Sequence, residues 1–457
     1  MSKLRSKKNM QVLMAATVTA AVVSGCMPTK SKETQAQTEA ATAAQTESAQ
    51  TDAAQEASVL EVNTTDPISI RMNWWGGDSR HQATLEAIKK FEEKYPNITV
   101  EAEYESFTGH EEKIALAINS GSAPDLMQMD WIWVENYSPD GTKFYDLNKV
   151  SNILDLSNYT DEDKELFTTN GVLQAVPISK TGRVFGWNKK TFDLIGADIP
   201  TTLDELLAVG ETFKAYDESY YPLVCKELDR AFLMRYYLES KYGKNWMNGN
   251  ELQYSQEEIA DGFDFLKTLE DSHVIPTLEK ISGDGADLID TNQNWIDGHY
   301  AGIFLYDTSV VKHAQAITDG ELVIGDYIKM GEYQGGITKA TQVWGISATT
   351  KYPAETAALI QFLMAEEDGV TTLGDTRGIP ANKAGLAMLD LSGSQVAEAN
   401  EKIMDWCKFE LDPIFERNSF TGADGTFYLA LQMHSYGQAD SMEAAKMVMD
   451  GIAKEVK

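Results

Sequence analysis

The sequence predicts an α/β protein in which the strands of a mostly parallel sheet alternate with flanking helices. Between residues 67 and 129 the apolar patterns follow the order strand, helix, strand, helix, strand, and such alternation builds parallel sheets with crossover helices. Similar strand and helix patterns return after Gly171. The part of the chain with a globular composition has about 390 residues, which is more than one domain of ordinary size requires. We therefore expect two α/β domains.

The first elements follow from residue spacing. Residues 67–75 are expected to form a strand, because apolar and polar residues alternate there. Ser79 and Gln82 have the spacing of a capping box, so a helix is expected to begin at Ser79. The remaining elements expected in this half are a strand at 98–104, a helix at 110–120 that ends at Gly121, and a strand at 125–129.

The rest of the chain continues the same alternation. Thr202 and Glu205 form a second capping-box pattern, and Pro353 stands where the first turn of a helix tolerates proline. The expected elements are strands at 172–178, 183–187, 300–306 and 342–347, and helices from Thr202, at 353–364, at 433–436 and at 442–452.

The N-terminus has the pattern of a secretion signal. Four basic residues precede an apolar run at 10–23, which is too short to span a bilayer. Val-Ser-Gly then precedes Cys26, as in a bacterial lipobox, so we expect a lipoprotein signal peptide at 1–25 and lipid attachment to Cys26. The alternative is a small-residue cleavage site followed by a chance cysteine. Residues 26–65 lack aromatic residues and are rich in Thr, Gln, Ala, Ser and Glu, so we expect a disordered tether.

Net charge excludes some partners. The formal net charge is −31, and removal of the four basic residues of segment 1–25, which has no acid, makes it −35. Such a chain is not expected to bind nucleic acid or to adhere electrostatically to an anionic membrane, so lipid alone should hold it on the outer face of a bacterial cell membrane. Cys225 and Cys407 could form a disulfide, but two buried free thiols are the preferred interpretation.

The patterns of common catalytic and metal centres are absent from the sequence. It has no His-Glu-x-x-His, Cys-x-x-Cys or Gly-x-Ser-x-Gly, and Gly283-Asp284-Gly285 lacks the third glycine of a dinucleotide loop. The run that begins at Asp290 resembles a calcium loop, but Trp295 and Ala301 replace its required glycine and glutamate. We therefore expect no metal, no cofactor and no enzyme activity, although counting alone does not exclude a pair of glycosidase carboxylates.

Aromatic residues gather at the expected strand ends, beside aspartates and glycines. In open α/β sheets, ligands bind beyond the carboxyl ends of the strands. Any of these tryptophans could equally be a core residue, and Asp130 could simply cap the segment that follows it. The residues are Trp74, Trp75, Asp130, Trp131, Tyr306, Asp307 and Trp344.

This combination suits a sugar. A pyranose packs its C–H face on an aromatic ring, and its hydroxyls need carboxylate acceptors or arginine donors. Arg80 and His81 lie in the first turn of an expected helix, where the helix dipole does not favour cations, so they either bind an anionic group or form an exposed pair. Arg183 lies in an apolar strand, so it either pairs internally or faces the cleft.

The chain resembles the family 1 extracellular solute-binding proteins of sugar ABC importers, the group that includes the maltose-binding proteins. The matching segments are Trp74-Trp75-Gly76-Gly77 through Glu92, 122–127, 175–189, 301–306, 344–347 and Arg377-Gly378-Ile379-Pro380. Residues 74–85 and 271–274 are most similar to oligogalacturonide-binding proteins. This similarity implies that Arg80, His81, Lys180 and Arg183 of the present chain would meet uronate carboxylates. The strongly negative net charge provides no long-range attraction for such an anion.

The resemblance implies a two-lobed periplasmic-binding-protein-like fold with the ligand cleft between the lobes. The lobes would be 66–179 with 348–408, and 180–347 with 409–457, joined by crossings near 178–180, 347 and 409–413. One cleft wall would carry Trp74, Trp75, Asp130 and Trp131. Tyr306, Asp307 and Trp344 would lie on the opposite wall or hinge, with Thr181 and Arg183 near a crossing.

The expected function is capture of a sugar, in particular an oligosaccharide, for delivery to the permease subunits of an ABC importer by a monomeric lipoprotein. The alternatives are a surface-anchored polysaccharide-degrading enzyme and a binder of the same fold for a peptide, a metal or another solute.

Overall fold

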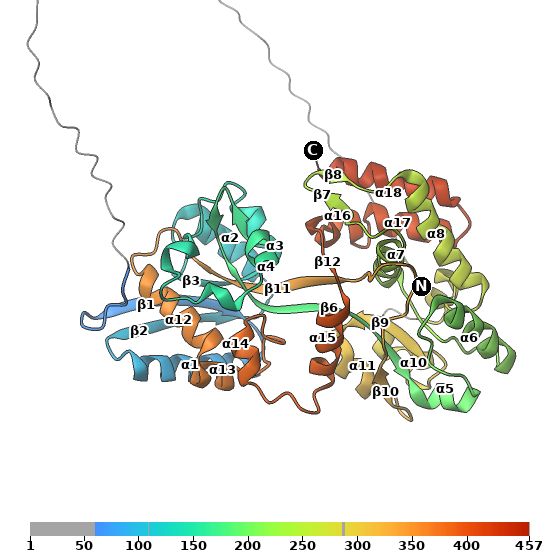
Figure 1. The fold of residues 1–457 in the computed structure, drawn as a ribbon, viewed down its shortest axis with the longest axis horizontal. Coiled ribbons are helices and arrows are strands. Elements are labelled where there is room, and N and C mark those ends of the chain that lie inside the picture. Colours follow the sequence, from blue (N-terminus) through green and yellow to red (C-terminus); the bar gives the residue numbers. More distant parts are fainter. Residues whose placement is uncertain (1–59, 108, 286–287, 457) are drawn as a thin grey trace, which may run out of the picture. The chain divides into compact units, whose positions relative to one another are not determined.

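The computed structural model describes residues 60–107, 109–285 and 288–456 (Figure 1). The expected signal peptide, Cys26 and most of the expected tether lie outside the described residues. The expected tether boundary at residue 65 is wrong, because residues 60–65 belong to the folded body. Asn152 Nδ2 donates a hydrogen bond to the carbonyl of Leu60 at 2.7 Å, and the backbone N–H of Asn63 donates to Glu355 Oε1 at 2.8 Å.

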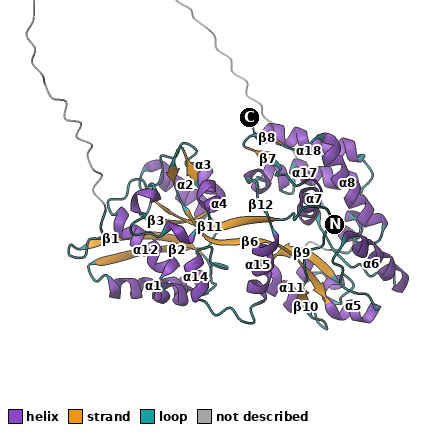
Figure 2. Cartoon of the chain, viewed as in Figure 1, coloured by secondary structure: helices purple, strands orange, loops and turns teal. Residues whose placement is uncertain are grey.

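The first lobe contains a parallel sheet. Strands β1 (Ile68–Trp75), β2 (Ile98–Glu105) and β3 (Leu126–Asp130) lie in the order β2-β1-β3. Because β2 and β3 flank β1 on opposite sides, right-handed crossovers place α1 (Asp78–Lys94) and α2 (His110–Ser120) on opposite faces (Figure 2). These elements confirm the α/β class and the expected order of elements.

One detail of the first helix was predicted wrongly. Helix α1 begins at Asp78 after Gly77, and no side chain caps it, so the capping box expected at Ser79 does not form. The second predicted capping box is confirmed at the start of α6 (Leu203–Tyr216). Thr202 Oγ1 accepts a hydrogen bond from the backbone N–H of Glu205, and the Glu205 side chain accepts one from the backbone N–H of Thr202.

Two long strands link the first lobe to the second. Strand β6 (Val176–Asn188) is continuous where two strands were expected, and β11 (Ile337–Ile346) begins five residues before the expected position. Both pair antiparallel, β6 with β11, β9 (Gly302–Tyr306) and β10 (Leu322–Ile324), and β11 with β3. The eight-stranded sheet is therefore mixed, with its parallel part in the first lobe and at β11 and β12.

The remaining elements cover this sheet. Those of the first lobe are α3 (Trp131–Tyr137), η1 (Leu147–Val150), η2 (Leu156–Asn158), α4 (Asp161–Leu166), β4 (Thr168–Thr169), β5 (Val172–Leu173), α12 (Pro353–Ala365), α13 (Glu367–Leu373) and α14 (Lys383–Met388). Those of the second lobe begin with α5 (Lys189–Ile195), α7 (Glu227–Tyr242), β7 (Met247–Asn248), β8 (Glu251–Leu252), α8 (Gln256–Asp271), α9 (Leu278–Gly283), η3 (Ile289–Thr291), α10 (Gln293–Ile296), η4 (Asp307–Ser309) and α11 (Val310–Ala316). They continue with α15 (Gln395–Trp406), β12 (Phe409–Glu410), η5 (Pro413–Glu416), α16 (Asn418–Thr421), α17 (Thr426–Ser435) and α18 (Ser441–Glu455).

The packing places two of the three chain crossings differently from the sequence. Helix α15 packs on β6 and α11 (Figure 1), and its Gln395 Nε2 donates to the carbonyl of Leu322 in β10 at 3.0 Å. We therefore place the third crossing at 389–394, before α15, and not at 409–413. Strand β11 leaves its second-lobe partner β12 at Thr338 and joins β3 from Gln342 onward, so we place the second crossing at 338–342 and not near Ser347.

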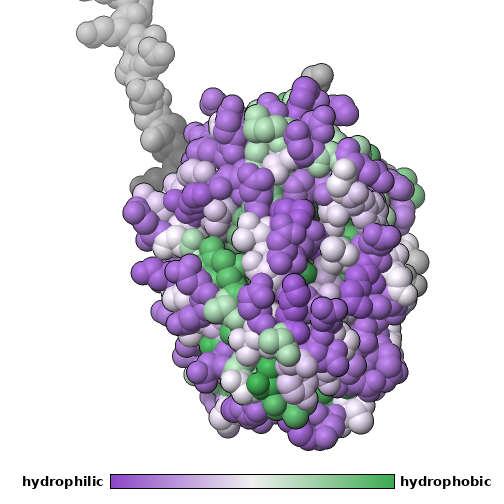
Figure 3. All heavy atoms as spheres, turned by 90° about the vertical axis from the view of Figure 1, so that its right-hand side faces the viewer, coloured by the Kyte–Doolittle hydropathy of each residue, from purple (hydrophilic) through white to green (hydrophobic). Residues whose placement is uncertain are grey.

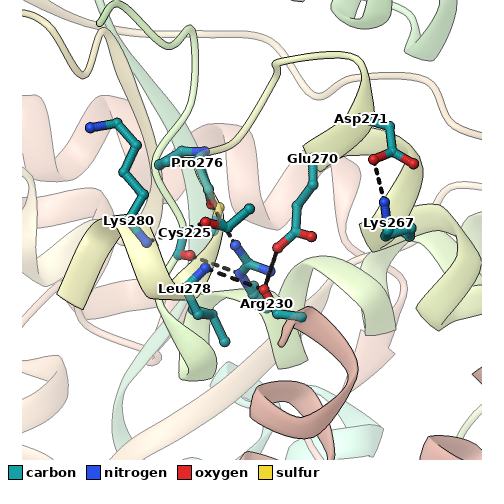
Figure 4. A network of polar contacts seen from close by, with 10 residues as sticks. Cys225, Arg230, Lys267, Glu270, Asp271, Pro276, Leu278 and Lys280 are labelled. Carbon is teal, nitrogen blue, oxygen red and sulfur yellow. Dashed lines mark hydrogen bonds and ion pairs between the residues drawn. The ribbon is translucent and has the colours of Figure 1, made fainter. Parts of the chain in front are cut away.

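The helices of the second lobe are held by a buried arginine. The Arg230 guanidinium lies 2.5 Å from Glu270 of α8 and donates to the backbone carbonyls of Cys225 and Pro276 (Figure 4). Ser435 of α17 donates to the same carboxylate at 2.5 Å. Arg230 thus joins α7, α8 and α17 around one charge.

Several general features complete the fold. Cys225 and Cys407 are both buried and free, which confirms the preferred interpretation. Among residues 60–107, 109–285 and 288–456, no helix combines the length and the apolar character needed to cross a bilayer, and no three His, Cys, Asp or Glu side chains are grouped so that they could hold a metal ion. The side of the second lobe drawn in Figure 3 exposes mainly hydrophilic residues, with separate small apolar areas between them.

Candidate functional site

The first lobe presents two aromatic stacks where β1 and β2 end. In the first, Trp74 is fully buried, donates from Nε1 to His81 Nδ1 at 3.1 Å, and stacks on Tyr104 with ring centroids 5.0 Å apart. Tyr104 is 45% exposed. The tryptophan therefore supports the tyrosine, and it is the tyrosine ring that faces solvent.

The second stack repeats this arrangement. Trp75 is 7% exposed and contacts Trp133, His110 and Phe107, and Phe107 is 55% exposed. The expectation that Trp74 and Trp75 themselves form the cleft wall is wrong in this arrangement, because their rings pack inside the lobe. Their positions at the end of β1 were predicted correctly.

Asp130 and Trp131 lie at the junction of β3 and α3. Asp130 caps α3, accepting from the backbone N–H of Ile132 at 3.3 Å, and remains partly exposed. Burial raises the pKa of Asp130 to about 6 against the opposing effect of Lys339. Trp131 is 3% exposed and is a core residue, so the expectation that it faces the cleft is wrong.

Trp344 does not lie at a strand end. It occupies the interior of β11, is fully buried and pairs with Gln128 of β3 and Val176 of β6. The Arg377 guanidinium lies over its ring, 5.4 Å from the centroid. Trp344 therefore lies in a strand that joins the two lobes, as the hinge alternative expected, but its ring is buried and does not stand on a cleft wall in this arrangement.

A layered cluster of charges and rings lies where β6, β9 and β11 meet. Arg183 is 4% exposed, pairs with Asp229 at 2.7 Å and lies over the rings of Phe232 and Tyr306, 4.5 and 4.6 Å from their centroids. Burial lowers the pKa of Arg183, but Asp229 and Tyr306 raise it by more. Arg183 therefore pairs internally, which decides between the two readings of its sequence position.

Lys339 of β11 extends this cluster toward Asp130. Its Nζ lies 5.3 Å from the Tyr306 ring centroid and donates to Glu416 Oε1 of η5 at 2.8 Å. Burial lowers the pKa of Lys339, whereas Tyr306, Glu416 and Asp130 raise it by more. The partly exposed Tyr306 ring thus has two cations close to it, and the carboxylates of Glu416 and Asp130 lie near Lys339.

Thr181 and Asp307 meet, but inside the protein. Thr181 Oγ1 donates to Asp307 Oδ1, and Asn400 Nδ2 of α15 donates to Asp307 Oδ2 at 2.8 Å. Thr181 is 2% and Asp307 1% exposed, and burial raises the pKa of Asp307. The two residues fasten α15 to β6, and their expected direct contact with a ligand is wrong in this arrangement.

Two of the four cations proposed to meet carboxylates, Arg80 and His81, have no acid partner within the described parts of the chain. Lys180 pairs with Asp163 at 3.0 Å and with Glu410 at 2.8 Å, and Arg183 pairs with Asp229. His81 accepts from Trp74 at Nδ1, so that nitrogen carries no proton. Arg80 donates to two backbone carbonyls and to no carboxylate within the described parts of the chain.

Two grooves lie near these residues. One, of about 290 Å³, lies between Glu135 of α3 and second-lobe residues that include Asn250, Asp412 and Arg417. Of its lining residues, Glu135 follows Asp130 closely in the sequence, and Arg417 comes directly after Glu416. A larger groove of about 680 Å³ lies between α14 and α15, and its lining is mostly apolar.

Several residues of this site could not be predicted from the sequence. Tyr104 lies at the end of β2 and Phe107 follows it, and their positions at the end of a strand were the available signal. Lys339 and its partner Glu416 gave no local signal, because they are 77 positions apart and meet only through the fold. Asp229 was missed for the same reason.

Comparison with known proteins gives the family. Residues 86–400, more than half of the chain, match the model of the bacterial extracellular solute-binding proteins. An uncharacterized ABC transporter extracellular-binding protein from Pyrococcus horikoshii is 26% identical over 216 residues, which are 44% of this chain and 42% of that relative. The chain thus aligns with less than half the length of this curated relative.

Solved structures match over more of the chain. A periplasmic oligogalacturonide binding protein from Yersinia enterocolitica is 32% identical, with a TM-score of 0.78 over 85% of this chain and all of that chain. The structure of that protein in complex with saturated digalacturonic acid gives a TM-score of 0.69 at 32% identity, over 85% of this chain and 99% of that one. A de novo designed cysteine esterase is 31% identical, with a TM-score of 0.79 over 85% of this chain and 99% of that one.

Proposed function

Because the chain belongs to the bacterial extracellular solute-binding proteins, we propose that it captures a sugar, in particular an oligosaccharide, for the permease subunits of an ABC importer. An ABC-transporter relative and the sugar-binding structural neighbours support this assignment. The protein then binds without turnover, as a monomer attached to the membrane through a lipid on Cys26.

One observation carries the proposal from the chain's own residues. The Tyr306 ring has Arg183 and Lys339 close to it, 4.6 and 5.3 Å from its centroid, and the Asp130 carboxylate lies near Lys339. An aromatic face offers packing to the C–H groups of a pyranose, and carboxylate and ammonium groups around it bind hydroxyls. Because Tyr306 and Asp130 come from different lobes, one sugar chain would contact both.

Such a shared site explains how binding would close the lobes. Solute contacts that exist in only one arrangement of the lobes shift the equilibrium toward that arrangement. The crossings at β6 and β11 are continuous strands that pair across both lobes, which is a suitable hinge for rigid-body closure. Because the groove between Glu135 and Arg417 is lined from both lobes, such a closure would change its width.

A glycan-panel titration tests the proposal. Calorimetry with neutral and acidic oligosaccharides should show saturable binding, and a bound sugar should raise the melting temperature. Tyr306→Ala should weaken binding about tenfold or more, in line with the loss of an aromatic stacking surface, whereas Tyr216→Ala, which removes an exposed tyrosine on α6, should leave affinity unchanged.

Three results would contradict it. Binding of peptides or metal ions but no glycan would indicate another solute. Release of reducing ends or unsaturated products from a polysaccharide would indicate an enzyme. Equal affinity for sugars in wild type and Tyr306→Ala would remove Tyr306 from the site.

A further inference from the structure

The ammonium of Lys180 is shared between the two lobes. Lys180 belongs to β6 at the first chain crossing, and its Nζ lies 3.0 Å from Asp163 Oδ1 and 2.8 Å from Glu410 Oε1. Asp163 belongs to α4 of the first lobe, whereas Glu410 belongs to β12 of the second (Figure 1). One cation at a crossing therefore pairs with a carboxylate from each lobe.

Each of these carboxylates is also fixed within its own lobe. Asp163 is 3% exposed, and its Oδ2 accepts from the backbone N–H of Thr160 at 3.2 Å in the capping box of α4. Glu410 Oε1 accepts a second hydrogen bond from Thr338 Oγ1 at 2.9 Å. Neither carboxylate can therefore follow Lys180 far without moving its own helix or strand.

Strand β11 is irregular beside this ammonium. Lys180 pairs with Ala340, and beyond Ala340 the register of β11 on β6 shifts. A bulge interrupts the hydrogen-bond ladder and lets a strand bend. This bulge lies in the crossing at 338–342, where β11 passes from β12 to β3. We therefore expect a rotation of one lobe against the other to bend the sheet here and to change the separation of the two carboxylates.

The present arrangement brings the candidate site together from both lobes. Lys339, which also lies in this crossing, contacts the Tyr306 ring and pairs with Glu416 of the second lobe. Burial raises the pKa of Asp130 of the first lobe to about 6, Lys339 lowers it, and Glu416 raises it. Site residues of the two lobes thus lie within electrostatic reach of one another. The arrangement in which Lys180 has both partners is the one in which a single sugar chain would contact both lobes.

We propose that Lys180, shared between Asp163 and Glu410, ties the lobes in the arrangement that binds the sugar and so sets the affinity without contact with the sugar. This inference rests on the proposed function and names Lys180 as a positioning residue of its site. Loss of the tie lowers the population of the binding arrangement, and the apparent affinity falls by the same factor. The two contacts act in series, because loss of either one releases one lobe.

A double-mutant cycle on sugar affinity tests the tie. The purified full chain is titrated calorimetrically with one acidic and one neutral probe, digalacturonic acid and maltotriose. Asp163→Asn and Glu410→Gln should each weaken binding of the probe that wild type binds about fivefold or more. The double variant should bind no more weakly than the weaker single variant, because a tie in series is cut only once.

A matched control lies on the same helix. Asp161 of α4 pairs with Lys164 within the first lobe, and its side chain is 96% exposed. Asp161→Asn removes the same charge from α4 without touching the tie, so its affinity should equal that of wild type. Lys180→Arg, which keeps the charge, should keep part of the wild-type affinity.

Small-angle scattering of the sugar-free protein gives a second measurement. Asp163→Asn and Glu410→Gln should increase the radius of gyration, because released lobes take up a wider range of arrangements, whereas Asp161→Asn should not. Lys180→Met should give the largest increase, since it leaves two carboxylates facing each other. Melting temperatures show which variants are folded, and if Lys180→Met is not, Asp163→Asn and Glu410→Gln decide.

The outcomes separate the two proposals. If the single variants keep wild-type affinity and radius of gyration and only melt earlier, Lys180 is merely structural and the tie is overturned. Losses that multiply in the double variant would also overturn it, and sugar binding would stand in both cases. If no oligosaccharide binds wild type, the proposed function fails, and the scattering measurement alone decides whether Lys180 ties the lobes.

Discussion

Arg183 of β6 and Asp229 of α7 form an ion pair at 2.7 Å inside the second lobe, with the guanidinium over both the Phe232 and the Tyr306 rings. The pair fixes the Tyr306 ring that we place in the site. Charge, packing and the candidate binding surface are therefore coupled at this point.

Arg183→Met should destabilise the protein by about 3–5 kcal/mol, because it leaves Asp229 without its buried partner. Arg71→Met, which breaks the more exposed pair with Glu103, should cost about 1 kcal/mol or less. Urea unfolding followed by tryptophan fluorescence measures both values. Equal losses in the two variants would show that burial of Arg183 does not determine its contribution.

Asp130→Asn should be more stable than wild type at pH 7 by about 1–3 kcal/mol. The pKa of Asp130 in the folded protein is about 6, above that of an unfolded chain, so the fold favours the protonated form. Its contribution to stability is full below the unfolded pKa and is lost as the pH rises through 6. The advantage of the variant should therefore vanish near pH 4, and asparagine still caps α3.

The same carboxyl should make sugar binding pH-dependent. If the Asp130 carboxylate accepts from sugar hydroxyls, wild-type affinity should fall as the pH drops from 7 to 5. Asp130→Asn should bind more weakly at pH 7 and show a flat profile, and calorimetry at three pH values checks this. Parallel profiles in the two proteins would exclude Asp130 from contact with the sugar.

Tyr104→Ala and Trp344→Ala should have opposite effects. Loss of the half-exposed Tyr104 ring should weaken glycan binding with little change in stability. Loss of the fully buried Trp344 should cost about 3–5 kcal/mol of stability through the cavity that it leaves. Paired melting and titration experiments separate these effects, and a strong loss of stability in Tyr104→Ala would show that the ring is structural.

Gly182→Ala should destabilise the junction of β6 and α15. An added Cβ would lie 2.6 Å from the carbonyl oxygen of Ile337 and 2.6 Å from Ile403 Cγ2, so β11 or α15 must shift, at about 1–3 kcal/mol. Gly77→Ala is the control, because a Cβ there meets nothing within 4 Å and its φ is −99°. Denaturant midpoints measure both, and similar midpoints would indicate that α15 moves freely on β6.

Local patterns in the sequence determined the fold class, the order of elements in the first lobe and the capping box at Thr202. Alternation and helical spacing report the burial of each side chain against its own element, so β1, α2 and α6 could be predicted from neighbouring residues. The N-terminal pattern, together with the aromatic residues and the family resemblance, also indicated a secreted sugar binder. These inferences depended on residues close together in the chain or on a known family pattern.

The tertiary structure alone decided which of the site candidates are exposed. In the sequence, Trp74, Trp131 and Trp344 stand at expected strands as Tyr306 does. In the structure the three tryptophans are buried, whereas Tyr306 is partly exposed. The pairs Arg183–Asp229 and Lys339–Glu416 join residues 46 and 77 positions apart, and Asn400 of α15 meets Asp307 across 93 positions. Side-chain burial and charge pairing are set by such distant partners, and no local spacing rule specifies them.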